Sequence, residues 1–305
     1  MLKALPELGA RPTIGVMGCF VQDIVVKPLQ ALVPGGSTKS RIVFAPGGFG
    51  PNVAWTAALE GASVRFLGHA GADAQGEALA RELQDAGVDV AVTRKGATAS
   101  VLVLVGTEGQ RTMAYDTSSF TLTSEDVTQS QLAGLSLLHL YEDLFQDATA
   151  EGAWKAVAAV RRSGGLVSLD AGNVARIQQQ GSAAFMGTVR KLAPEVLFAN
   201  EEEAAALWPA GDVTAPGLVV VKHGPRPTVV YAADGTELLS VDVAPVADVV
   251  DTTGAGDAMA GAFLAAWAAG CDLREAVEAG HRAAGAVVAQ YGARLPRSWV
   301  PSRPH

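Results

Sequence analysis

The residues best suited to chemistry lie in a loop that leads into a helix late in the chain. Residues 251–257 read Asp-Thr-Thr-Gly-Ala-Gly-Asp, and an apolar run follows. Backbone N–H groups at a helix start are unpaired and lie at the positive end of the helix dipole, so Gly254, Ala255 and Gly256 can hold an anion. Asp257 adds a carboxylate, and an anion hole beside a base is what phosphoryl transfer to a hydroxyl requires. The alternative is a glycine-rich turn in which Asp257 only stabilises the helix dipole.

A second motif lies early in the chain, where residues 47–54 read Gly-Gly-Phe-Gly-Pro-Asn-Val-Ala. The glycines Gly47 and Gly48 let the backbone approach a ligand closely, and Asn52 offers both a donor and an acceptor at a helix start. Asp23 follows the first predicted strand. Together these residues predict a polar cluster at strand ends, where open α/β sheets bind ligands.

Strand-like and helix-like segments alternate along the chain, which predicts an α/β fold with a mostly parallel sheet covered on both faces. The predicted strands are Thr13–Cys19, Val64–Gly68, Leu135–Tyr141, Leu166–Asp170, Val196–Ala199 and Leu218–Lys222. The predicted helices are Asn52–Leu59, Gly76–Ala86, Ala148–Arg162, Ser182–Leu192, Glu201–Trp208, Asp257–Ala269 and Leu273–Gln290.

Two β-rich segments interrupt this alternation, Lys39–Phe44 and Ser100–Asp116. Their alternating pattern predicts a small antiparallel sheet that projects from the main one as a lid; a decorated sheet edge is the other interpretation. Since no internal repeat or low-complexity linker occurs, we expect one domain over residues 1–305, with lid segments at about 26–46 and 97–118.

The composition excludes several functions. With 49% apolar residues in 305, the chain can bury a large core, and its net charge of −8 without a basic block argues against nucleic acid or membrane partners. The two cysteines and the absence of a secretory signal predict a cytoplasmic protein. No P-loop motif occurs, and Met259 replaces the third glycine of a dinucleotide-binding pattern.

Both motifs, in this order and spacing, resemble those of the ribokinase (PfkB-type) family of carbohydrate kinases, and the resemblance covers nearly the whole chain. The N-terminal pattern extends through Gly61 and Gly71, and the C-terminal one through residues 261–264, Gly-Ala-Phe-Leu. The resemblance implies a three-layer α/β/α sandwich with a small β-sheet lid. It also implies ATP-dependent phosphorylation of a hydroxyl on a sugar or similar molecule, with Asp257 as the base and residues 254–257 as the anion hole.

The resemblance further implies metal sites. Asn200 and Glu203 match the family's Asn-x-x-Glu, which organises Mg²⁺ and its waters; the alternative is an acidic helix start favoured by the dipole. Asp251 and Thr253 match positions around a monovalent cation in activated members. Potassium activation and a structural turn are both compatible with these two residues.

Binding residues for ATP and the sugar are implied in the same way. Lys222 and Gly224 match the nucleotide loop, in which Pro227 stands where a glycine is usual, and His281 matches a residue of the adenine pocket or lies on the surface. The positions that match the sugar site are Asp23, Gly47, Gly48 and Asn52.

The acceptor is less defined. Tyr141 stands at the end of the central strand, where ribokinase-like chains place an acid that touches the sugar. Period-two alternation puts three lid residues on one face, where they would suit a keto-sugar acid or a phosphosugar, or would cover a dimer interface. These residues are Arg111, Met113 and Tyr115. Lys39 and Arg41 add positive charge, and nucleosides remain candidates.

Two functions of other classes are alternatives to the kinase. A non-catalytic sugar-binding protein would not need a base such as Asp257. An NAD-dependent oxidoreductase would need the dinucleotide-binding glycine pattern, which this chain lacks. As a base, Asp257 is expected to be weak and to accept its proton late, because an ordinary aspartate has a pKa near ~4. The family resemblance suggests a homodimer formed through the lid.

Overall fold

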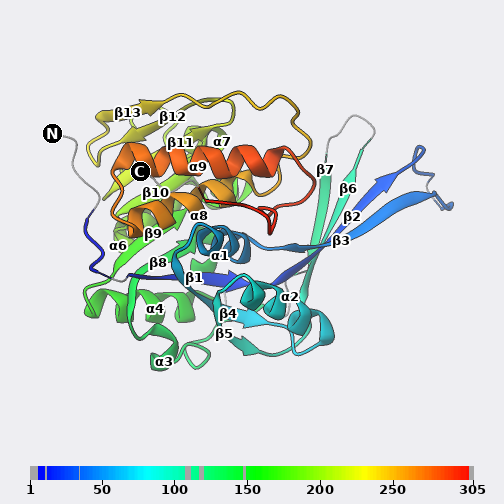
Figure 1. The fold of residues 1–305 in the computed structure, drawn as a ribbon, viewed down its shortest axis with the longest axis horizontal. Coiled ribbons are helices and arrows are strands. Elements are labelled where there is room, and N and C mark those ends of the chain that lie inside the picture. Colours follow the sequence, from blue (N-terminus) through cyan, green and yellow to red (C-terminus); the bar gives the residue numbers. More distant parts are fainter. Residues whose placement is uncertain are drawn as a thin grey trace.

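A mostly parallel sheet forms the centre of the molecule (Figure 1). The computed structural model describes residues 6–10, 12–33, 35–106, 111–116, 120–146 and 149–301. Within them, nine strands pair in the order β13-β12-β11-β10-β9-β8-β1-β4-β5, and β12 is antiparallel to both its neighbours. The strands are β1 (Thr13–Cys19), β4 (Ser63–Ala70), β5 (Asp89–Arg94), β8 (Leu135–Tyr141), β9 (Leu166–Asp170), β10 (Val196–Asn200), β11 (Leu218–His223), β12 (Arg226–Tyr231) and β13 (Glu237–Val241).

Helices cover both faces of this sheet. One face carries α1 (Phe49–Leu59), α2 (Ala74–Asp85), α8 (Ala255–Ala268) and α9 (Leu273–Val288). The other carries α3 (Gln129–Leu132), α4 (Ala150–Arg162), α5 (Val174–Gln180), α6 (Ser182–Leu192) and α7 (Glu201–Leu207). Successive strand residues point to opposite faces, so Val16 packs in the first core and Met17 in the second. The three-layer α/β prediction is confirmed.

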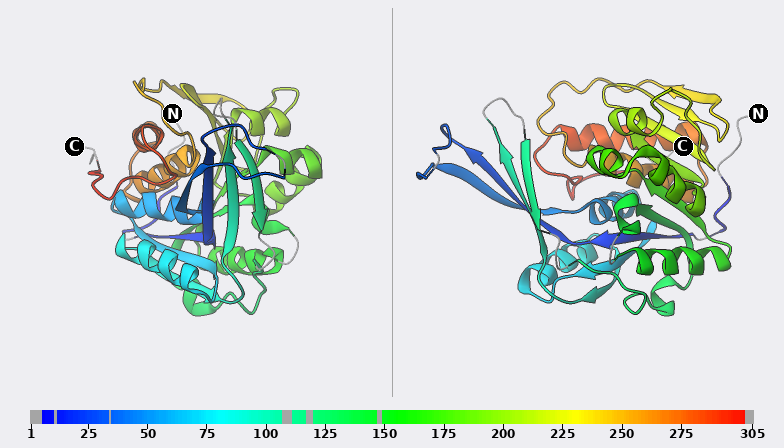
Figure 2. Two further views of the ribbon diagram at one scale, coloured as in Figure 1. Left: turned by 90° about the vertical axis from the view of Figure 1, so that its right-hand side faces the viewer. Right: turned by 180° about the vertical axis from the view of Figure 1, so that it is seen from behind.

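A smaller sheet of four described strands projects from the main one (Figure 2), and its strands are called the lid below. It consists of β2 (Val21–Pro28), β3 (Ser40–Gly47), β6 (Ala99–Val105) and β7 (Arg111–Asp116) in the order β3-β2-β6-β7. The prediction of a purely antiparallel lid is wrong in one respect, because β2 and β6 pair in parallel. Asp23, Val101 and Tyr115 are paired across the strands and therefore share one face of the lid.

Most predicted elements are present, with ends shifted by a few residues. The elements that sequence patterns missed are β2, β5, β12, β13, α3 and α5. Apart from β2, which has eight residues, these elements have four to seven residues, and α5 contains three consecutive glutamines, so the apolar periodicity of the short ones is weak. None of the helices in the described ranges is long and apolar enough to cross a membrane.

Close packing of α1 against α8 positions the early and late motifs together. A Cβ atom on Gly261 of α8 would lie 2.6 Å from the carbonyl oxygen of Val53 and 2.9 Å from Cβ of Thr56, both on α1. Only glycine permits this approach, which brings the first turns of the two helices side by side.

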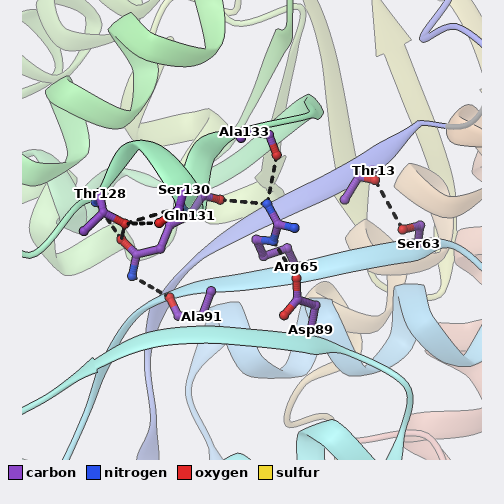
Figure 3. Close-up of polar contacts among 9 residues, drawn as sticks. All are labelled: Thr13, Ser63, Arg65, Asp89, Ala91, Thr128, Ser130, Gln131 and Ala133. Atoms are coloured by element: carbon purple, nitrogen blue, oxygen red, sulfur yellow. Dashed lines mark hydrogen bonds and ion pairs between the residues drawn. The ribbon is translucent and has the colours of Figure 1, made fainter.

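Polar contacts link the chain segments at the amino ends of the parallel strands (Figure 3). The Arg65 guanidinium pairs with Asp89 at 2.6 Å and donates to the carbonyls of Gln131 and Ala133 at 3.1 and 2.9 Å. The Gln131 side chain donates to the carbonyl of Ala91 at 2.8 Å. These contacts join β4, β5 and α3 at the amino ends of the strands. The candidate site lies at the other edge, where the parallel strands end.

Candidate active site

The carboxyl ends of five neighbouring parallel strands bring polar side chains to one edge of the sheet, as predicted from the strand pattern. β8 ends at Tyr141, β9 at Asp170 and β10 at Asn200, while Lys222 is the penultimate residue of β11. β1 ends at Cys19, directly before the lid strand that carries Asp23. The first turns of α1 and α8 reach the same edge.

The late motif forms the first turn of α8. Gly254 has φ of 75°, a left-handed conformation that glycine adopts without strain, and among the described residues no side chain caps this helix. By contrast, α7 and α9 both begin with capping boxes. The N–H groups at residues 255–257 therefore start a helix without the side-chain acceptor that usually satisfies them.

Asp257 is held by the early motif. Asn52 Nδ2 donates to Asp257 Oδ2 at 2.9 Å, which joins the first turns of α1 and α8. Burial raises the pKa of Asp257 to about 7, the Asn52 hydrogen bond opposes this rise, and the Asp170 charge adds to it. The expectation of an ordinary, weakly basic aspartate is therefore wrong, because the surrounding protein destabilises the charged carboxylate.

A buried ion pair lies beside the same turn. Lys222 Nζ is 2.9 Å from Asp170 Oδ2, and a Cβ on Gly256 would be 3.3 Å from this ammonium. Burial alone would lower the pKa of Lys222, but Asp170 and then Glu203 raise it above its ordinary value. A permanent positive charge thus faces the first turn of α8. Asp170 was not predicted as a site residue, since nothing marked it beyond its position at a strand end.

Asn200 and Glu203 bond to each other. Asn200 Oδ1 accepts from the Glu203 backbone N–H at 2.9 Å, and Glu203 Oε2 accepts from the Asn200 N–H at 2.8 Å, which is a capping box. Burial and the Asp170 charge raise the pKa of Glu203. No group of three or more His, Cys, Asp or Glu residues in the described ranges could hold a metal by itself. The excess of carboxylates around Glu203 nevertheless suits a cation.

The residues predicted to bind the sugar lie around Asp23. Its carboxylate lies over Gly47, where a Cβ would come within 2.3 Å of it, and burial raises the pKa of Asp23 to about 6. Gly48 precedes α1 as its N-cap residue. Tyr141 is buried, and its ring centroid is 5.4 Å from that of Phe49. Tyr141 thus packs against the start of α1 at the end of β8.

The lid adds further side chains to the same side. Met113 and Tyr115 are exposed, and the register of β6 with β7 places Tyr115 on the face of Asp23. The side chain of Arg111, the third member of the predicted face, lies outside the described residues.

One buried cation near Asn52 was missed by sequence reasoning. Arg294 Nε donates to Asn52 Oδ1 at 3.0 Å, and the guanidinium carbon lies 5.3 Å from the centroid of the Trp55 ring. Burial lowers the pKa of Arg294 to about 10, so the group stays charged at neutral pH. No motif or spacing pointed to it, because Arg294 follows the last helix in an irregular segment.

The remaining predicted residues lie on the β11–β12 side. Gly224 and Pro225 form a two-residue turn between paired His223 and Arg226, so the predicted nucleotide loop is a tight hairpin. His281 Nε2 is 2.8 Å from Thr228 Oγ1. His281 also lines a hollow of about 450 Å³, together with Val241, Asp242, Ala244, Pro245, Val246, Glu278, Arg282 and Gly285.

Asp251 and Thr253 form a hydrogen-bonded turn before α8. Asp251 Oδ1 accepts from the Thr253 N–H and hydroxyl at 2.9 and 2.6 Å, and Asp251 Oδ2 accepts from the Gly292 N–H at 3.3 Å. These contacts agree with a structural turn, which is one of the two interpretations that the sequence left open.

The stability of the ligand-free protein is expected to reflect the raised pKa of Asp257. The folded state holds this proton up to about pH 7, whereas an unfolded aspartate releases it near 3.8, so stability falls as pH rises between these values. At pH 8 the free energy of unfolding of the Asp257→Asn variant should therefore exceed that of the parent by up to about 4 kcal/mol, and this difference should vanish near pH 4. Thermal melts at both pH values measure it, with exposed Asp248→Asn as the control; an equal shift at both would contradict the raised pKa.

This fold and site define a class, the ATP-dependent kinases with a ribokinase-like α/β/α fold. The chain belongs to the pfkB family of carbohydrate kinases, whose family model matches residues 16–300. It is 30% identical to the ATP-dependent ribose-1-phosphate kinase of Halopiger xanaduensis over 81% of this chain and 82% of that protein. In fold it resembles the adenosine kinase of Sinorhizobium meliloti (TM-score 0.81, 23% identity, 94% and 96% of the two chains). It likewise resembles a fructokinase with bound ATP from Xylella fastidiosa (TM-score 0.77, 19% identity, 93% and 94% of the two chains).

Proposed function

We propose that this kinase transfers the γ-phosphate of ATP to a hydroxyl of a sugar or sugar-like molecule, with Asp257 as the base. The observation that carries the proposal is the 2.9 Å bond from Asn52 to Asp257 at the start of a helix without a side-chain cap. Asn52 fixes one carboxylate oxygen and leaves the other for the acceptor hydroxyl. A pKa of about 7 suits a base that works near neutral pH.

The charge on the transferred group would be met by main-chain and side-chain donors. The N–H groups of residues 254–257 form the anion hole, and the Lys222 ammonium lies beside Gly256. Donors that are already oriented stabilise developing charge without reorganisation, which is usually the largest catalytic effect. The pair with Asp170 holds Lys222 in place before ATP binds.

Metal ions enter at two places in the proposal. Asn200 and Glu203 would hold Mg²⁺ through water, and Mg²⁺ would neutralise phosphate charge. Burial and then the Asp170 charge raise the pKa of Glu203, and a cation beside these two carboxylates would relieve the second effect. Potassium near Asp251 and Thr253 is checked by comparing rates in K⁺ and in tetramethylammonium.

The adenine of ATP would occupy the hollow beside His281, with Lys222 and Gly224 on its phosphate side. Gly285 lines this hollow, and a Cβ there would meet Val246 at an ordinary 3.5 Å. A Gly285→Phe substitution should fill the space and raise the KM for ATP roughly 10-fold or more, about 1.4 kcal/mol of lost binding. Gly285→Ala is the matched control. Steady-state kinetics should show an unchanged KM for the acceptor, and a normal KM for ATP in the Phe variant would place adenine elsewhere.

The wider organisation follows the family. We propose one kinase domain over residues 1–305 with lid segments at about 26–46 and 97–118. The lid face opposite Asp23 exposes Ile42, Phe44 and Leu102, which supports a homodimer that covers them. Sedimentation velocity tests this homodimer.

Neither Cys19 nor Cys271 forms a disulfide, which supports a cytoplasmic setting.

The proposed function is tested by ADP release with ATP, Mg²⁺ and a panel of acceptors. The panel contains sugars, sugar phosphates, a keto-sugar acid and nucleosides, each with the parent and with Asp257→Asn. ADP release that depends on both the acceptor and Asp257 supports the kinase. If an acceptor raises the melting temperature while no ADP forms, the chain is a non-catalytic binder. A nucleoside preferred over every sugar would favour the nucleoside alternative.

A further inference from the structure

Arg294 places unused hydrogen-bond donors at the sugar side of the site. Its side chain is 6% exposed, and its Nε donates to Asn52 at 3.0 Å. Nη1 and Nη2 are buried and have no hydrogen-bond partner within the part of the chain that the structure describes. A guanidinium carries five N–H donors, so most of its capacity is unused.

The packing around Arg294 compensates for its burial only in part. Glu82 Oε2 is 3.6 Å from Nη1, which is within ion-pair range and beyond hydrogen-bond range. The Trp55 ring and Asn52 hold the group in place. A buried charge with unmade hydrogen bonds costs folding free energy, and such a group in a functional site is explained when a ligand completes it.

We propose that Arg294 binds an anionic group of the acceptor, a phosphate or a carboxylate, and so selects an acidic sugar. This inference rests on the kinase function proposed above. Asn52 contacts both Arg294 and Asp257, through Oδ1 and Nδ2 respectively. An acceptor beside Asn52 would therefore place its hydroxyl at Asp257 and its anion at Arg294. The planar guanidinium fork matches the two oxygens of either anion.

The lid supplies positive charge on the same side. Lys27 and Arg41 are paired across β2 and β3, and Lys27 lies four residues from Asp23 and thus on the same face. The chain as a whole carries a net charge of −8, so the charge of these two residues is opposite in sign to that of the whole protein. Positive charge at the acceptor entrance would attract an acidic substrate.

The test compares matched acceptors by their kcat/KM values. The pairs are ribose 1-phosphate with ribose, fructose 6-phosphate with fructose, and 2-keto-3-deoxygluconate with fructose, which separates phosphate from carboxylate. The parent should prefer one anionic acceptor over its neutral partner. Arg294→Gln should reduce kcat/KM for that acceptor roughly 10- to 100-fold more than for its neutral partner, the scale of hydrogen bonds to a charged group. Arg294→Lys should fall between the two.

Arg297 provides the matched control. It also lies over the Trp55 ring, at 5.4 Å, but it is exposed and pairs with Asp85. Arg297→Gln should keep the parent's preference. If Arg294→Gln does not fold, Arg294→Lys and the parent's own preference decide the matter.

Each result separates the two proposals. A parent that prefers neutral acceptors, or an Arg294→Gln variant that loses both acceptors equally, overturns the role of Arg294 and leaves the kinase intact. If no acceptor gives ADP that depends on Asp257, the proposed function fails. Thermal stabilisation by inorganic phosphate then still tests Arg294: a shift that Arg294→Gln reduces supports the anion site, and an unchanged shift rejects it.

Discussion

Asp257→Asn should lower kcat by roughly 10²–10⁴-fold while the affinity for ATP is largely kept, because this is the usual contribution of a positioned base. Asparagine can still accept the hydrogen bond from Asn52 Nδ2, so the first turn of α8 should keep its geometry. It cannot take the proton of the acceptor hydroxyl. The defect should therefore appear in turnover.

Turnover and nucleotide binding are measured separately for this variant, by coupled ADP release and by calorimetric titration. In the parent, kcat/KM should rise with pH through about 7, where the Asp257 carboxyl of the free enzyme loses its proton. The Asn variant should lack this rise. Asp248→Asn, which changes an exposed aspartate before the loop, serves as the control. A variant of Asp257 that turns over like the parent would show that another group is the base.

Lys222→Met should destabilise the protein by about 3–5 kcal/mol and also suppress turnover. Removal of one partner leaves the other carboxylate buried without its counter-charge, and this is the costly way to break such a pair. The pair is well enclosed, with side-chain exposures of 12% and 18% for Lys222 and Asp170. The same substitution removes the positive charge beside Gly256, where the transferred phosphate would lie.

A second substitution separates these two effects. The double variant Lys222→Met with Asp170→Asn should regain much of the lost stability, because no unpaired charge remains, but it should stay slow. Denaturant melts and ADP release on the same preparations measure both. Recovery of turnover together with stability would mean that Lys222 acts only in folding.

Local patterns accounted for much of the architecture. β1, β8, β9 and α6 have the predicted bounds, since each is a continuous apolar run or a clear amphipathic helix. The parallel pairing of β2 with β6 could not be predicted from sequence patterns, because the residues of one strand do not determine the direction of its neighbour. β12 follows Pro225 and contains Pro227, so its local pattern favours a loop.

The sequence by itself determined which residues are proposed for catalysis, because the proposed anion hole and the proposed base are neighbours in one short segment, residues 254–257, at the start of α8. Only the tertiary structure decided how that base is tuned and what surrounds it. The partners of Asp257 come from distant segments: Asn52 on α1, Asp170 on β9 and Lys222 on β11. Arg294 could be assigned only once folding had set it against Asn52. Burial and the summed field of such groups depend on the packed chain, so no short motif encodes them.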